Sequence, residues 1–172
     1  MIFLSMEQTA TLKHWFAPER PGPLVGPHVI HTGHVIRRLG PADTQLLEGL
    51  GPESFWISKT WGGPGGLASS GFGWGAFVEG QLASVACTFF LGAHYEDIGV
   101  ATEPQYRGLG LSTACARALC GDIRAREHQP SWTTSPDNIG SVRVAEKLGF
   151  VFDRHDSLVV IGIEIPVPAS NA

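Results

Sequence analysis

A glycine-containing loop in the middle of the chain has the residue types and spacing of an anion-binding site. The loop, Gln105 to Gly110, reads Gln-Tyr-Arg-Gly-Leu-Gly and lies between a predicted strand and a predicted helix. Its two glycines, Gly108 and Gly110, let the backbone turn sharply and approach a ligand without a Cβ in the way. The amides from Arg107 to Ser112 and the positive end of the helix dipole favour a pyrophosphate. We call this segment the glycine loop.

Two common nucleotide-binding loops do not fit this sequence. The ATP-binding loop needs a lysine after its last glycine, but Leu111 and Ser112 follow the glycine loop instead. The dinucleotide fingerprint needs a third glycine where the chain has Thr113. A Gly-x-Gly pair is also compatible with an ordinary turn from strand to helix. The loop alone therefore does not identify the anion, although Arg107 can add a direct charge contact.

A second motif lies further along the chain, on the next predicted strand and helix. It comprises Asn138, Ser141 and the stretch Glu146 to Phe150, which reads Glu-Lys-Leu-Gly-Phe. Together, and in this order, the two motifs resemble those of the GCN5-related N-acetyltransferase (GNAT) superfamily, whose loop pattern is Gln/Arg-x-x-Gly-x-Gly/Ala. The resemblance covers about residues 35–164.

The resemblance implies both a fold and a co-substrate. The fold is a central mixed, mostly antiparallel sheet of six to seven strands, flanked by helices and splayed between its fourth and fifth strands. The co-substrate is acetyl-CoA, whose pantetheine arm lies in the splay and pairs like a strand. By resemblance, the cofactor-binding residues are Val100, Ala101, Thr102, Gln105, Arg107, Gly108, Leu109, Gly110, Leu111, Ser112, Asn138 and Ser141.

Some of these residues have more specific implied roles. The backbone of Val100 and Thr102 would pair with the pantetheine arm, and an amide of Val100 or Ala101 would polarise the thioester carbonyl. Asn138 would reach the arm from the side of the fifth strand. Asn138 can also act only as the cap of its helix, a role that is compatible with the same fold.

Direct attack of an amine on the thioester requires the loss of a proton, so the resemblance implies a general base. His94, Glu96 and Asp97 precede the glycine loop. Strand alternation places His94 and Glu96 on one face and Asp97 on the other. Spacing from the glycine loop puts His94 where histone-type members carry their base glutamate, and Glu96 lies one pleat nearer the thioester. We favour Glu96 over His94, and both are also compatible with solvent-exposed residues at a hairpin end.

The residue that usually protonates the departing thiolate is absent. Many members of the family have a tyrosine immediately before the Glu-Lys-Leu-Gly-Phe stretch, where this chain has Ala145. Ser141, or a water held by Asn138, can take this role, and the thiolate can also leave unaided because thiols are fairly acidic. We therefore expect an acetyl-CoA-dependent N-acetyltransferase. The alternatives are a non-catalytic or atypical acyl-CoA-binding domain, or the transfer of a different acyl group.

The elements that position these residues follow from the hydrophobic pattern. Alternating apolar residues predict strands, and apolar residues at helical spacing predict helices. The predicted strands are residues 34–39, 73–78, 81–91, 94–102, 131–135, 150–155 and 158–165, and the predicted helices are residues 41–50, 110–126 and 138–148. This order indicates an α+β domain with a mixed sheet and helices on its faces.

The segment from Phe55 to Gly71 is rich in glycine and tryptophan, so we expect it to lack regular structure. Its aromatic side chains can line a pocket or fill the edge of the core. In the family that the chain resembles, the region corresponding to Phe55 to Gly75 shapes the acceptor pocket, which favours a compact or partly apolar small-molecule amine. Amino-acid derivatives and amine-bearing antibiotics are examples, and protein amino groups are an alternative.

Composition narrows the remaining classes of function. The 172 residues carry a formal net charge of −4 without a cluster of basic side chains, which argues against a nucleic-acid partner. Three cysteines without a CxxC spacing indicate reduced thiols. No apolar run is long enough to span a bilayer. We therefore expect a cytoplasmic protein without a membrane partner. The resemblance makes a homodimer one possible assembly, because family members often dimerise.

No metal site is expected, because His28, His31 and His34 have no nearby cysteine or carboxylate to complete a coordination shell. Prolines and scattered aromatic residues predict a partly ordered N-terminal arm over residues 1–33. From the resemblance we expect residues 34–165 to form a single GNAT-type acyltransferase domain, and residues 166–172 to form a flexible tail.

Overall fold

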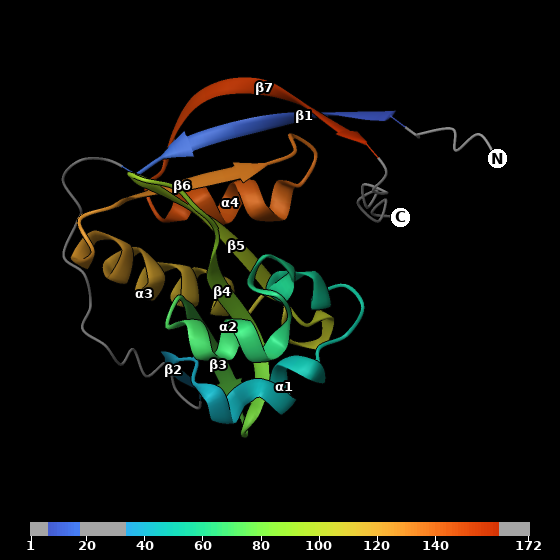
Figure 1. Cartoon of the computed structure of the whole chain (residues 1–172), viewed down its shortest axis with the longest axis vertical. Coiled ribbons are helices and arrows are strands. Elements are labelled where there is room, and N and C mark those ends of the chain that lie inside the picture. The colour runs from blue at the N-terminus through green and yellow to red at the C-terminus, as the bar shows by residue number, and fades with distance from the viewer. Residues whose placement is uncertain (1–6, 18–33, 162–172) are drawn as a thin grey trace.

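The computed structural model describes residues 7–17 and 34–161, which form a seven-stranded sheet with helices packed against it (Figure 1). The strands are β1 (Glu7–Phe16), β2 (His34–Arg38), β3 (Gly73–Val78), β4 (Gln81–Leu91), β5 (Tyr95–Thr102), β6 (Gln129–Thr134) and β7 (Val151–Ile161). The helices are α1 (Thr44–Glu48), α2 (Pro64–Ser70), α3 (Leu111–Ala125) and α4 (Ile139–Lys147), with 3-10 helices η1 (Pro41–Asp43), η2 (Phe55–Trp61) and η3 (Pro104–Tyr106).

The strand order across the sheet is β2-β3-β4-β5-β6-β1-β7. β5 and β6 run parallel, and the other neighbouring strands are antiparallel. The predicted α+β fold, with a mixed and mostly antiparallel sheet, is therefore confirmed.

α3 packs on one face of the sheet through small buried side chains. Leu111, Cys115 and Leu119 recur at helical spacing, and each is at most 2% exposed. They share a core with Trp74 of β3 and Trp132 of β6. Because much of the helix surface at this contact is Cys and Ala, the helix can lie close to the sheet, as the sequence predicts.

α1 and α2 cover the opposite face of the sheet. Leu47 of α1 and Leu67 of α2 form a second core with Val85 of β4 and Ala101 of β5. We call the two sides of the sheet the α3 face and the α1–α2 face. Side chains alternate between them along each strand, so residues adjacent in sequence reach different surroundings.

β5 and β6 separate after a short paired stretch. Three pairs join them at one end: Tyr95 with Gln129, Glu96 with Pro130, and Asp97 with Ser131. Within the described residues the two strands have no pairing beyond this point, and Figure 1 shows them diverging. This is the predicted splay between the family's fourth and fifth strands, and Asp97 lies at its apex.

The N-terminal arm contains more regular structure than the sequence interpretation expects. Its residues 7–16 form β1, which lies between β6 and β7 within the sheet. Trp15 is buried in the core of the α3 face. The sequence interpretation misses this strand because it gives the prolines that follow more weight than the polar–apolar alternation from Thr9 to Lys13. The rest of the arm, including His28 and His31, and the predicted tail lie outside the described residues.

The segment from Phe55 to Gly71 is also helical where irregular structure is predicted. It forms η2 and α2, which follow one another closely. Pro64 begins α2 at its first turn, and Gly71 ends it with a φ of 77°. A Cβ at Gly66 would lie 1.8 Å from the carbonyl oxygen of Trp61. The glycines therefore end the helices and allow them to approach, rather than preventing them.

One long strand, β7, stands where the sequence predicts two. It continues through Asp156 and Ser157, between the two predicted strands. β7 pairs with β1 along its length. The N-terminal strand that the sequence interpretation lacks thus explains why the final strand is continuous.

Candidate active site

The glycine loop joins β5 to α3 and leaves the start of α3 open. Gly108 and Gly110 have φ values of 81° and 76°, in the left-handed region that a residue with a Cβ adopts at a cost. Gly110 is the N-cap of α3 and has no side chain to cover the first amides of this 15-residue helix. Those amides are therefore available as hydrogen-bond donors beside the positive end of the helix dipole. The arrangement can bind an anion.

The residues predicted to contact the anion differ in their exposure and in whether the side chain or only the backbone can reach a ligand. Five of them are exposed: Gln105, Arg107, Gly108, Leu109 and Gly110. Ser112 is partly exposed, whereas the side chain of Leu111 is buried, so only the backbone of Leu111 can reach a ligand. Arg107 forms an ion pair with Glu53. The sequence interpretation did not include Glu53, whose carboxylate competes with a phosphate for the guanidinium group.

Along the open edge of β5, every second residue points its backbone N–H and C=O groups into the splay. The amide of Glu103 donates to the carbonyl of Ala83 at 3.0 Å, at the end of the β4–β5 ladder. Because alternate residues of an antiparallel ladder bond to the partner strand, Ala101 faces β4, whereas Val100 and Thr102 face the open edge. The expected backbone contacts from Val100 and Thr102 fit this geometry. Of the two amides considered for the thioester carbonyl, that of Val100 is the available one.

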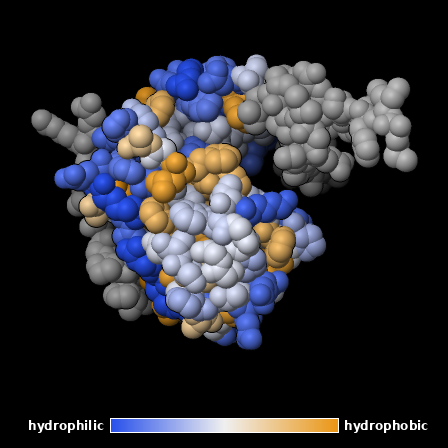
Figure 2. Space-filling view, viewed as in Figure 1, coloured by the Kyte–Doolittle hydropathy of each residue, from blue (hydrophilic) through white to orange (hydrophobic). Residues whose placement is uncertain are grey.

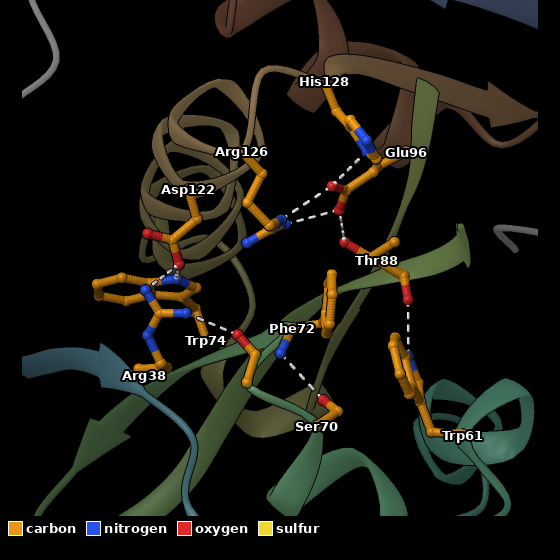
Figure 3. A network of polar contacts seen from close by, with 11 residues as sticks. Arg38, Trp61, Ser70, Phe72, Trp74, Thr88, Glu96, Asp122, Arg126 and His128 are labelled. Atoms are coloured by element: carbon orange, nitrogen blue, oxygen red, sulfur yellow. Dashed lines mark hydrogen bonds and ion pairs between the residues drawn. The ribbon is translucent and has the colours of Figure 1, made fainter. Parts of the chain in front are cut away.

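Glu96 lies fully buried on the α3 face, with both carboxylate oxygens occupied (Figure 3). Arg126 donates to the two oxygens at 2.9 and 2.6 Å, and the Thr88 hydroxyl donates at 2.5 Å. His128 Nδ1 lies 3.0 Å from Oε1. Burial alone raises the pKa of Glu96, but these hydrogen bonds and positive charges outweigh burial and hold the pKa below its usual range. The contacts argue against the predicted role of Glu96 as a general base.

His94 lies in the turn before β5 and is exposed. Its carbonyl accepts a hydrogen bond from the amide of Gln129 at 2.8 Å, so it belongs to the paired end of β5 and β6. The open part of β5 lies on the other side of Asp97. The position of His94 therefore gives little support to its predicted role as a second candidate base.

Asp97 lies at the apex of the splay and on the α1–α2 face, opposite to Glu96. It shares this face with Gly99, where a Cβ would meet Phe89 and Ile57. Asp97 Oδ1 accepts hydrogen bonds from the hydroxyls of Thr133 at 2.9 Å and Ser131 at 3.2 Å.

Burial raises the pKa of Asp97 to about 6, although the two hydroxyls oppose this effect. A carboxyl group with that pKa is mostly ionised at neutral pH and is a stronger base than an ordinary aspartate. The sequence places Asp97 among the candidates without favouring it. The sequence offers one further signal, the aromatic pair Phe89 and Phe90 on the neighbouring strand, of which Phe90 is the cross-strand partner of Asp97.

A row of aromatic side chains borders Asp97 on the same face. Phe90 is its cross-strand partner and is 61% exposed. The β4–β5 register is irregular between Thr88 and Phe90, at a bulge that contains Phe89. The rings of Phe89 and Phe90 lie 4.9 Å apart, and the ring of Trp56 in η2 lies 5.2 Å from Phe89.

We call Trp56, Phe89 and Phe90 the aromatic row. Trp56 and Phe89 pack against the core of the α1–α2 face, whereas Phe90 is exposed beside Asp97. In Figure 2 hydrophobic residues reach the surface among hydrophilic ones. Trp56 of η2 thus fills the edge of the core, and Phe90, from a different segment, offers the apolar surface.

Asn138 and Ser141 begin α4, whose buried side chains pack on the α3 face. The Asn138 side chain accepts a hydrogen bond from the Ser141 amide at 3.2 Å, which confirms the predicted capping role. The Ser141 hydroxyl accepts from the Trp132 indole at 2.9 Å and so keeps its own proton for donation. Ala145, at the position of the usual tyrosine, is fully buried.

The three cysteines are buried and poorly suited to nucleophilic catalysis, as predicted. Burial raises the pKa of Cys87 and of Cys120 to about 12, and it also raises the pKa of Cys115. The reactive thiolate form is therefore scarce at neutral pH.

Residues 7–17 and 34–161 contain neither a candidate membrane-spanning helix nor a candidate metal-binding cluster. No helix in these ranges has both the length and the apolar composition needed to cross a membrane. No group of three or more His, Cys, Asp or Glu residues in them is placed to hold a metal ion.

The family model and the curated relatives that match this chain are all described as acetyltransferases. The model of the GNAT acetyltransferase family matches residues 35–157. An uncharacterized N-acetyltransferase from Streptomyces virginiae is 48% identical over 97 residues, which are 56% of this chain and 41% of that protein. A second uncharacterized N-acetyltransferase, from Bacillus subtilis, is 30% identical over 97 residues, which are 56% of this chain and 37% of that protein. The chain thus spans less than half the length of these curated relatives.

Solved structures are similar over most of the described fold. One from Novosphingobium aromaticivorans, assigned to the GNAT family as an acetyltransferase, has a TM-score of 0.70 and 25% identity, covering 94% of this chain and 67% of that one. A GCN5-related N-acetyltransferase-like protein from Streptococcus suis has a TM-score of 0.67 and 20% identity, covering 90% and 62%. The Streptococcus suis structure, at 20% identity, resembles this chain in fold alone.

Proposed function

Because the chain belongs to the GNAT acetyltransferase family, we propose that it transfers an acetyl group from acetyl-CoA to the amine of a small molecule. The observation that carries this proposal is the course of β5. The strand runs from Asp97, at the apex of the splay, along an open edge to the glycine loop. One strand thereby joins a group that can deprotonate an amine to a site suited to a pyrophosphate.

In this proposal acetyl-CoA binds along the open edge. The free amides at the start of α3 hold the pyrophosphate, and the backbone of Val100 and Thr102 pairs with the pantetheine arm. Asn138 reaches the arm from the side of β6. Arg107 exchanges its partner Glu53 for a phosphate when the cofactor arrives. The thioester then lies close to the apex of the splay.

Asp97 is the general base that we propose for the reaction. The amine nitrogen attacks the thioester carbon, and the Asp97 carboxylate takes the proton that the nitrogen loses. The amide of Val100 stabilises the negative charge on the carbonyl oxygen. The carbon–sulfur bond then breaks, and the CoA thiolate takes a proton from the Ser141 hydroxyl, which solvent reprotonates, or directly from water. The products are the N-acetylated amine and CoA.

The aromatic row supports an acceptor with an aromatic or otherwise apolar body. Phe90 offers an exposed ring next to Asp97, so an apolar group that rests on this ring brings a neighbouring amine to the base. The same apolar contact excludes water from Asp97. A drier surrounding favours the neutral form of the carboxyl group and so keeps it basic.

A non-catalytic acyl-CoA-binding domain is the alternative. The buried Ala145 favours it, because this position leaves no side chain to protonate the leaving thiolate. The same cofactor contacts are also compatible with the transfer of an acyl group other than acetyl.

An assay of free-thiol release tests these readings. We expect turnover of acetyl-CoA with a panel of small amines, highest for amines with an aromatic or apolar body. Propionyl-CoA and succinyl-CoA, run in parallel, identify the acyl group. Acetyl-CoA binding in calorimetry without thiol release for any amine would contradict the proposed transfer and support the alternative.

A further inference from the structure

A chain of polar side chains leads from Asp97 across the sheet to the surface. Thr133 Oγ1 on β6 lies 2.9 Å from Asp97 Oδ1 and 3.0 Å from Nδ1 of His14 on β1. His14 Nε2 in turn lies 3.4 Å from Oδ2 of Asp156 on β7, whose side chain is 52% exposed. His14 and Thr133 are register partners, so their side chains share one face of the sheet.

The single hydroxyl proton of Thr133 fixes the direction of these hydrogen bonds. The hydroxyl donates to Asp97 Oδ1, so toward His14 its oxygen can only accept. His14 Nδ1 therefore carries a hydrogen and donates it to Thr133. In the described part of the chain both hydrogen bonds to Asp97, from Thr133 and Ser131, reach Oδ1. This arrangement leaves Oδ2 for another partner.

We infer that His14 is a positioning residue of the proposed reaction: through Thr133 it holds the Asp97 carboxyl group with Oδ2 free for the acceptor amine. The inference rests on the proposed function. Without the Nδ1 donor, the Thr133 hydroxyl loses the second contact that holds it in place and can rotate away from Asp97. The carboxylate then loses a hydrogen bond that stabilises its charge and one of the contacts that orient it.

Charged groups from a neighbouring strand lie beside His14. β7 contributes Asp156 and also Arg154, which is the register partner of His14 and donates to Asp156 at 3.0 Å. β6 contributes the neutral Thr133, behind which lies Asp97. His14 precedes the residues 35–157 that match the family model. The strand β1 thus brings a side chain from outside the matched region to the candidate base.

The experiment is a comparison of the pH dependence of kcat/KM for the acceptor amine. Thr133→Val and His14→Leu are expected to move the acidic limb upward by about half a pH unit or more, because an ionised carboxylate that loses a hydrogen bond becomes more basic. Thr133→Ser keeps the hydroxyl and His14→Asn keeps an N–H donor, so both should retain the native profile. If His14 and Thr133 had only a structural role, their variants would lower the rate but would not shift the acidic limb.

Controls separate this inference from the proposed function. Lys13→Gln alters the neighbouring residue of β1, on the other face, and should leave the profile unchanged. Thr133→Val is close to isosteric, so it carries the test even where His14→Leu unfolds the chain. If Asp97→Asn abolishes turnover but Thr133→Val has the native pH profile, the role of His14 is overturned and the base stands. Full activity of Asp97→Asn would overturn the proposed base itself.

Discussion

Glu96 and Asp97 are adjacent in β5, yet their carboxyl groups lie on opposite faces of the sheet with pKa values shifted in opposite directions. The guanidinium of Arg126 and the Thr88 hydroxyl, against the cost of burial, hold the pKa of Glu96 below its usual range. Burial among apolar neighbours raises the pKa of Asp97 to about 6. Such separation is typical of sites in which one carboxylate is structural and the other takes part in proton transfer.

Glu96→Gln is expected to lower the free energy of unfolding by about 3 kcal/mol at pH 7, because it leaves Arg126 beside a neutral partner. The folded-state pKa of Glu96 is lowered, so its stabilising effect is present above the unfolded pKa of about 4.3 and is lost as the pH falls through the folded value. The difference between the native chain and the variant should therefore shrink in acid. Urea unfolding at several pH values measures it.

The matched control for this variant is Glu48→Gln, which changes an exposed carboxylate on α1 and should alter stability little. Folded Glu96→Gln should keep the native pH profile of activity. Native stability at pH 7, or a shifted activity profile, would contradict the structural role of Glu96.

Gly110→Asp is expected to weaken acetyl-CoA binding about 100-fold, because it places a carboxylate where the helix N-terminus would receive a pyrophosphate. Gly149→Asp is the control: Gly149 has a φ of 83° and open surroundings, so the backbone cost of about 1 kcal/mol is similar. Calorimetry on both variants separates lost binding from lost stability. Equal affinities for the two would move the anion site away from the glycine loop.

Local signals account for the parts of this site that the sequence predicts. Gly108 and Gly110 mark the left-handed turn that a residue with a Cβ adopts only at a cost, and apolar residues at helical spacing mark α3. Asn138 is a cap because its side chain reaches an amide in the same turn. Each of these features depends on residues close together in the chain, so pattern alone is enough to locate them.

Glu53→Gln is expected to raise the affinity for acetyl-CoA by about 2- to 5-fold at low salt, because it frees Arg107 from an exposed ion pair of modest strength. Salt screens exposed charges, so the gain should fall as ionic strength increases. Calorimetric titrations at two salt concentrations, with Glu48→Gln as the control, test this effect. Unchanged affinity at low salt would show that Arg107 does not contact the cofactor.

Phe90→Ala is expected to raise KM for an aromatic amine about 5- to 10-fold and to leave KM for acetyl-CoA unchanged. Phe90 is 61% exposed, so its loss should cost little stability. Leu91→Ala is the control, since Leu91 is 53% exposed but is the cross-strand partner of Glu96 rather than Asp97. Equal KM values for the two variants would remove Phe90 from the acceptor site.

Long-range contacts decide the features that the sequence does not predict. Alternation separates Glu96 from Asp97, but only the end of α3 brings Arg126 to Glu96 and so removes it as a base. His14 reaches Thr133 because β1 inserts beside β6, a pairing between distant parts of the chain. No local pattern specifies either partner.

If Asp97 is the general base, the pH dependence of kcat/KM for the acceptor amine should differ between the native chain and Asp97→Asn. The native chain should lose activity as the pH falls through about 6, and the variant should lose about 100-fold or more in kcat without a change in acetyl-CoA affinity. The variant should also be at least as stable above pH 6, because it no longer buries an ionised carboxylate. A folded Asp97→Asn chain with native kcat and the native acidic limb would contradict the account.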